Sequence, residues 1–241
     1  MNIIEILKRM FITRKCIACS KVISYDRNLP FCEECELFWE QIKEVKCQRC
    51  GHEIWYCSCI PINLRKLPCS LTAISVFYSS KSENRVNEIV FTLKRKGFRS
   101  VVDFVAEQMK YSLEKLFEIN GLNIKEYTIT YITRKRKGIL KYGFDHSRLL
   151  AQSLSSKLGI KYERVFDNRG KNEQKTLTKV ERLKNAKNSY ILRKNIDVQN
   201  KKYILVDDVL TSGATLKVCA EILYSYGAEN VIFAVYAKDN F

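Results

Sequence analysis

Proline, glycine and long apolar runs are scarce in this chain. Its 241 residues include three prolines and nine glycines, a composition that excludes collagen-like and low-complexity chains. No run of eighteen apolar residues occurs, so no transmembrane helix is predicted. The first eleven residues lack a basic start and a small-residue cleavage site, which indicates a short amphipathic helix rather than a secretory signal. We therefore expect a cytoplasmic protein with reduced cysteines.

Acidic residues are too few to balance the basic ones. The chain has 26 Asp and Glu against 42 Lys and Arg, a formal net charge of +16. This balance favours polyanionic partners, namely nucleic acid, phosphorylated substrates or an anionic membrane surface. The alternative is a lysine-rich, AT-biased genome. Hydrophobic residues make up 46% of the chain, which is ample for a folded core.

Cysteine is abundant, and eight of the ten cysteines lie between residues 16 and 59. Pairs separated by two residues let both thiolates reach one tetrahedral ion, so eight thiolates predict two zinc sites. An interleaved pairing and a substitution of His52 for one cysteine remain open. The simplest assignment places Cys16, Cys19, Cys32 and Cys35 on one ion, and Cys47, Cys50, Cys57 and Cys59 on the other.

A structural role is expected for this zinc. About fifty residues bury too little apolar surface to fold alone, and metal binding would contribute roughly 10–16 kcal/mol. Four thiolates also leave no open position for catalysis. Trp39, Trp55 and Tyr56 lie among the cysteines and are candidates for stacking on bases, although core packing is the simpler interpretation of each. The predicted domains are a double zinc ribbon over 1–65 and a larger domain over 66–241, with a linker over 61–68.

The larger domain alternates strands with helices. This order predicts an α/β fold with a mainly parallel sheet covered by helices on both faces, and ligands beyond the carboxyl ends of the strands. Residues 167–186 are polar and predict a mobile loop and then a short helix from Thr178. Strands are expected at 71–78, 127–132, 161–166, 203–208 and 231–236, and helices at 85–96, 99–118, 144–158 and 214–226.

The main candidate site is the stretch 203–216, where a buried strand runs into Asp207 and Asp208. Two carboxylates at a strand end can accept hydrogen bonds from ribose hydroxyls or hold a divalent cation. The helix that follows presents unpaired N–H groups, which bind a phosphate. The residues expected on a 5′-phosphate are Thr211, Ser212, Gly213, Ala214 and Thr215. The alternative is a capped helix with exposed acids.

A second candidate phosphate loop follows the strand at 127–132. Across residues 133–148 there are six basic residues and one acid. Such a loop at a strand end can bind pyrophosphate, although a solvated basic loop is the alternative. We expect Cys69 and Cys219 to be packing residues and His146 to be a simple helix-start residue. The residues expected on pyrophosphate are Arg134, Lys135, Arg136 and Lys137.

The stretch 203–216 resembles the phosphoribosyl-pyrophosphate (PRPP) signature of type I phosphoribosyltransferases. Over essentially its whole length the chain resembles the ComF/GntX family, which joins an N-terminal zinc ribbon to a phosphoribosyltransferase-like domain. Residues 142–146 stand where the family has an Arg-Gly-Phe-Asn-Gln-like motif, with Asp145 and His146 as departures. The family's next motif is matched by Gln174, Lys175, Thr176, Leu177, Arg182 and Asn185.

The resemblance implies a protein of natural competence that handles incoming single-stranded DNA with a helicase or recombination partner. A second hypothesis is an active phosphoribosyltransferase, in which Asp207 and Asp208 position ribose and Mg²⁺. A third is a regulatory module that senses PRPP or a nucleotide. No segment for recognising an acceptor base is identifiable.

Overall fold

The computed structural model describes residues 13–78, 85–170 and 189–239. The helix predicted in the first eleven residues lies outside these ranges, as does the helix predicted from Thr178. The motif matched by residues 174–185 also lies outside them.

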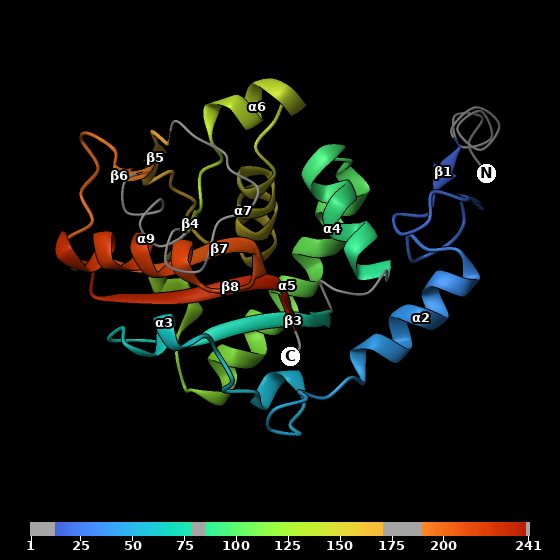
Figure 1. Cartoon of the computed structure of the whole chain (residues 1–241), viewed down its shortest axis with the longest axis horizontal. Coiled ribbons are helices and arrows are strands. Elements are labelled where there is room, and N and C mark those ends of the chain that lie inside the picture. The colour runs from blue at the N-terminus through green and yellow to red at the C-terminus, as the bar shows by residue number, and fades with distance from the viewer. Residues whose placement is uncertain (1–12, 79–84, 171–188, 240–241) are drawn as a thin grey trace.

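One four-stranded sheet organises the molecule. Its order is β3 (Thr72–Tyr78), β8 (Asn230–Asp239), β7 (Lys202–Leu210) and β4 (Tyr127–Tyr131), and every neighbouring pair is parallel (Figure 1). β-Branched and aromatic residues fill these strands because both faces of the sheet are buried. The predicted parallel α/β sheet is confirmed.

Helices cover both faces of this sheet. α5 (Arg99–Ile119) and α7 (His146–Leu158) pack on one face, and α9 (Ala214–Ser225) packs on the other. Side chains of β7 alternate between these two layers: Ile204 faces α5 and α7, whereas Leu205 faces α9.

Among the remaining elements, α2 (Glu33–Lys43) and α4 (Arg85–Arg95) are longer helices and the others are short. The cysteine-rich segments hold β1 (Arg14–Lys15), β2 (Val22–Ile23), α2 and η1 (Ile54–Tyr56). The others are α3 (Ile62–Arg65), η2 (Ile124–Glu126), α6 (Arg136–Tyr142), β5 (Phe166–Asn168) and β6 (Tyr190–Leu192).

Two predicted elements were wrong. The strand expected at 161–166 is reduced to one bridge between Tyr162 and Ile129, after which the chain leaves the sheet and β5 pairs antiparallel with β6. The linker expected at 61–68 contains α3, whose Leu64 is fully buried against the α9 layer. Pro61 precedes the first turn of α3, a position where proline starts a helix rather than marking a flexible linker.

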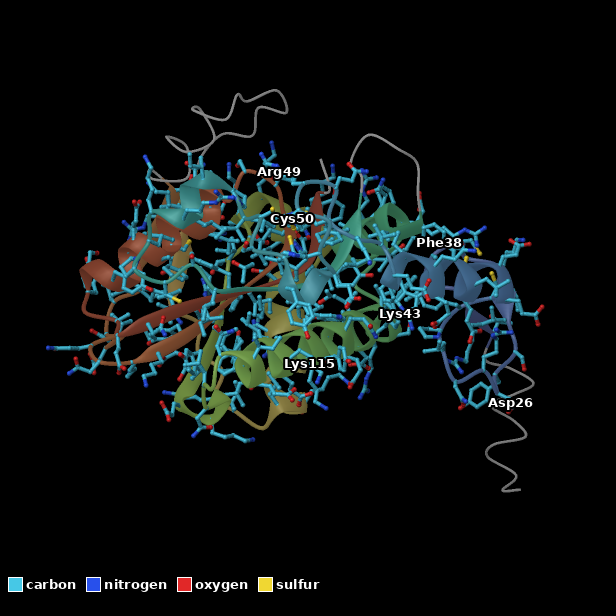
Figure 2. The ribbon with its side chains drawn as sticks, turned by 90° about the horizontal axis from the view of Figure 1, so that it is seen from below. Asp26, Phe38, Lys43, Arg49, Cys50 and Lys115 are labelled. Carbon is cyan, nitrogen blue, oxygen red and sulfur yellow. The ribbon has the colours of Figure 1, made fainter. Side chains whose placement is uncertain are left out.

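The cysteine-rich segments share their cores with the sheet. Trp39 of α2 packs edge-on against Phe104 of α5, with ring centroids 5.0 Å apart, and is buried, so its interpretation as a core residue is confirmed. Trp55 makes a similar contact with Tyr111 at 5.2 Å. In Figure 2, Asp26 lies on the part of the N-terminal segment farthest from the sheet, whereas Cys50 lies over the body of the molecule.

Within the described ranges, no helix combines the length and apolarity needed to cross a membrane.

Candidate functional site

A cavity of about 290 Å³ opens at the carboxyl ends of β4 and β7. It is lined from both strand ends, from α4 and from the first turns of α7 and α9. Because parallel strands end at the same edge, residues far apart in sequence meet there. The lining residues used below are Lys94, Arg134, Lys135, His146, Asp207, Asp208 and Thr215.

Asp208 is the buried charged centre of this cavity. Its Oδ2 lies 3.1 Å from Lys94 Nζ and 3.1 Å from His146 Nε2, and the residue is 4% exposed. Burial alone would raise the pKa of Asp208. The charge of Lys94 and the close approach of the His146 imidazole outweigh it and hold that pKa well below its usual range. Asp208 is therefore a carboxylate at neutral pH.

Asp207 has the opposite electrostatic surroundings. Its Oδ1 accepts a hydrogen bond from the backbone N–H of Asp208 at 2.9 Å. Burial and the neighbouring charge of Asp208 raise the pKa of Asp207, so this carboxyl gains a proton more readily than an ordinary aspartate. An incoming cation or hydrogen-bond donor would favour its charged form.

The N-terminus of α9, where the sequence predicts phosphate binding, borders the cavity through Thr215. No acidic side chain occupies its first turn. Ser212 Oγ lies 3.4 Å from the N–H of Ala214. Gly213 caps the helix with φ +67°, a conformation that other residues adopt with strain. Thr215 lines the cavity, whereas Thr211 is exposed.

α3 supports this phosphate loop from behind. Asn63 Nδ2 donates to the backbone carbonyl of Ser212 at 3.1 Å. A Cβ atom on Gly213 would lie 3.0 Å from Leu64 Cγ, so the loop and the buried leucine are in close contact. The segment expected to be a linker therefore positions the loop, a role that its sequence did not indicate.

The basic loop after β4 reaches the same cavity with two of its four predicted residues. Arg134 and Lys135 line it, whereas Arg136 and Lys137 are exposed in the first turn of α6. The backbone N–H of Arg134 donates to Asp145 Oδ2 at 3.0 Å. The loop is thus shorter than predicted, because α6 begins at Arg136.

Sequence reasoning missed Lys94 and undervalued His146. His146 begins α7 as expected, but it also contacts Asp208. Asp145 caps the same helix while holding the Arg134 loop. Both departures from the family motif are thus used in the site. Lys94 lies in the last turn of α4, where a lysine interacts favourably with the helix dipole. Nothing in its local sequence indicates a contact with a distant carboxylate.

The two consecutive cysteine groups each come together in space. The four sulfur atoms of each group lie within 4.8 Å of one another, and four thiolates on one zinc would be about 3.8 Å apart. The donor set therefore fits a closed structural zinc site in each group. The groups are Cys16, Cys19, Cys32 and Cys35, and Cys47, Cys50, Cys57 and Cys59.

Comparison with known proteins gives one family match and several partial matches to relatives. Residues 138–240 match the phosphoribosyl transferase domain family. The DNA utilization protein YhgH of Escherichia coli K12 is 36% identical over 91 residues, which cover 37% of this chain and 39% of that protein. YhgH of Shigella flexneri shows the same identity and coverage. The match thus spans 39% of the length of these relatives.

Two solved structures are similar over 56% of this chain. The purine phosphoribosyltransferase of Pyrococcus horikoshii Ot3 is 22% identical, with 74% of that chain covered and a TM-score of 0.37. The hypoxanthine phosphoribosyltransferase of Staphylococcus aureus is 14% identical, with 61% of that chain covered and a TM-score of 0.36. The family and relative matches confirm the resemblance predicted from the sequence. Residues 138–240 match the phosphoribosyl transferase domain family, and part of the chain is similar to the DNA utilization protein YhgH.

Proposed function

We propose that the cavity binds a 5-phosphoribosyl group, as PRPP or a phosphoribosyl nucleotide. The observation that carries this proposal is the convergence of an acid pair, a helix N-terminus and a basic loop on one cavity. Thr215 and the α9 N–H groups would hold the 5′-phosphate. Arg134 and Lys135 would hold the pyrophosphate, and Asp207 with Asp208 would accept hydrogen bonds from the ribose hydroxyls.

The acid pair also fits Mg²⁺, which prefers oxygen ligands and usually binds one or two carboxylates together with substrate phosphates. When bound, the ion would neutralise phosphate charge. Lys94 and His146 already face Asp208, so Asp207 is the carboxylate better placed to meet the ion. Lys94 would keep Asp208 charged and in position.

We propose single-stranded DNA as the macromolecular partner, in a cytoplasmic role in DNA uptake with a helicase or recombination mediator. The +16 charge and the likeness to DNA utilization proteins support this role. If it holds, the affinity for a single strand falls with salt at a log–log slope of roughly −0.7 per phosphate contacted. Binding that is absent or insensitive to salt contradicts it.

An active phosphoribosyltransferase is the second candidate, because the same cavity would stabilise charge during transfer of the ribosyl group. The test is pyrophosphate release from PRPP with a panel of nucleobases. Turnover that Asp208→Ala abolishes supports an enzyme. PRPP-dependent thermal stabilisation without turnover supports a sensor instead.

A further inference from the structure

A basic and aromatic surface borders the cavity. We call it the rim and define it as residues 91–99, from the end of α4 to the start of α5, together with residues 134–142, which include α6. The rim contains no acidic residue. Its nine basic residues are Lys94, Arg95, Lys96, Arg99, Arg134, Lys135, Arg136, Lys137 and Lys141.

Large apolar side chains stand among these cations and are open to solvent. Phe91 is 41% exposed, Phe98 51% and Leu140 75%. The guanidinium of Arg95 lies 3.9 Å from the Phe91 ring centroid, and Lys96 Nζ lies 5.8 Å from that of Phe98. Exposed aromatic rings interleaved with cations form the kind of surface that stacks on nucleobases while the cations contact the phosphates.

The two halves of the rim form one continuous surface. Arg134 Nη1 donates to the backbone carbonyl of Lys94 at 3.0 Å. A Cβ atom on Gly97 would lie 2.7 Å from the Phe144 ring, so the α4–α5 turn touches the chain that leaves α6. Figure 1 shows α4 and α6 on the same side of the sheet. Lys94, Arg134 and Lys135 belong to both the rim and the cavity.

We propose that the rim is the binding surface for single-stranded nucleic acid, and that the strand passes the mouth of the phosphoribosyl cavity. The proposal rests on the proposed DNA role and gives that role a location. Exposed lysines and arginines would follow the phosphates, and Phe91 and Phe98 would stack on bases. Stacking requires bases that are free of a duplex, so a single strand is favoured over double-stranded DNA.

The test measures binding of a fluorescent twenty-nucleotide strand by anisotropy at several salt concentrations. The charge variant is Lys96→Gln, Arg99→Gln and Lys141→Gln, which changes three exposed residues outside the cavity lining. Its log–log salt slope should fall by about 2, since each phosphate contact contributes roughly 0.7. Phe98→Ala should weaken binding by about 5- to 150-fold with an unchanged slope. Phe98→Leu keeps an apolar side chain but not stacking, and should weaken binding similarly.

The control is Lys115→Gln with Lys194→Gln, a half-buried and an exposed lysine outside the rim. Lys115 lies sixteen residues along α5 from Arg99, about 24 Å at 1.5 Å per residue. The control should keep wild-type affinity. Circular dichroism, zinc content and PRPP-dependent stabilisation confirm that each variant is folded.

The outcomes separate the rim from the proposed function. If the rim and control variants weaken strand binding equally, or not at all, the rim is not the binding surface, and the proposed DNA role is unaffected. A wild-type protein that binds no strand overturns both. Equal affinity for duplex DNA overturns the stacking argument. Preferential binding to vesicles of phosphatidylserine, lost in the rim variants, assigns the rim to a membrane surface instead.

Discussion

Asp207 and Asp208 are adjacent in β7, yet their surroundings shift their pKa values in opposite directions. Asp208 lies against Lys94 and His146, which lower its pKa. The pKa of Asp207 is raised mainly by burial and by the neighbouring charge of Asp208. Only one of the two is stabilised as a carboxylate in the absence of ligand. The charged form of Asp207 would be stabilised by a bound cation or hydrogen-bond donor. The opposite pKa shifts also predict opposite effects of the two residues on the free energy of unfolding.

Asp207→Asn should stabilise the protein, and increasingly so as pH rises. The pKa of Asp207 is higher in the folded than in the unfolded state, so between those two values the folded state binds more protons and wild-type stability falls with rising pH. Asparagine cannot ionise, so it removes this pH-dependent loss of stability. Thermal unfolding of both proteins from pH 4 to 8, without added magnesium, should show a difference in midpoint that grows with pH. A constant difference would contradict the raised pKa.

Asp208→Asn should have the opposite effect. The pKa of Asp208 is lower in the folded state, so its stabilising contribution is fully present above the ordinary aspartate value and is lost as pH falls through the folded pKa. The variant should lose about 1.5–3 kcal/mol of unfolding free energy at pH 7, typical of hydrogen bonds to a charged group. Urea unfolding at pH 7 measures this loss. A variant as stable as the wild type would mean that Lys94 and His146 do not hold Asp208.

At the scale of elements, the predicted phosphate loop before α9 depends on α3. Gly213 has φ +67° and lies against Leu64, so Gly213→Ala combines backbone strain with a steric contact. Gly121 is the matched control, because it has φ +62° with nothing within 4 Å of a Cβ atom. Gly121→Ala should cost about 1–2 kcal/mol of unfolding free energy through strain alone. Gly213→Ala should cost more, as urea unfolding of both would show, and should also weaken PRPP binding. Equal losses would argue against the contact with α3.

Local sequence was sufficient where one element carries the whole pattern. The apolar run into Asp207 and the turn at Gly213 predicted β7, its loop and α9, because strand, turn and helix signals follow one another there. Local sequence was insufficient where a tertiary contact determines whether an element forms. α3 forms because Leu64 finds a core, and α6 forms within a segment whose dense positive charge indicated a loop.

The same limit applies to the site. Residues on β7, on α9 and after β4 were predictable because parallel strands end at one edge. Lys94 and Asn63 were not, since each depends on where a separate element packs. The fold class therefore follows from sequence, whereas the pairing of charges follows only from the structure.

At the scale of the whole molecule, the cysteine groups are tied to the sheet domain. Arg85 of α4 donates to Cys35 Sγ at 2.8 Å. Cys47 and Cys57 share a core with Phe233 of β8. Each group thus contacts a different layer of the fold, so metal bound at the two groups would contribute to the stability of both layers.

Removal of metal should destabilise the entire chain. We expect two zinc ions per chain, and a strong chelator should lower the thermal midpoint while unfolding remains a single transition, because the cysteine segments share both cores. Calorimetry with and without chelator, with metal content measured in parallel, checks this. Two separate transitions, with the later one unaffected by the chelator, would indicate independent domains.

The most direct test of the central claim is calorimetric titration of PRPP with Mg²⁺ into the zinc-loaded protein and into the Asp207→Ala, Asp208→Ala double variant. We predict binding by the wild type and its loss in the folded double variant, since both acids line the cavity with Thr215 and Arg134. A folded, zinc-loaded wild type that binds no PRPP, or a double variant that binds it equally well, would contradict a phosphoribosyl site in this cavity.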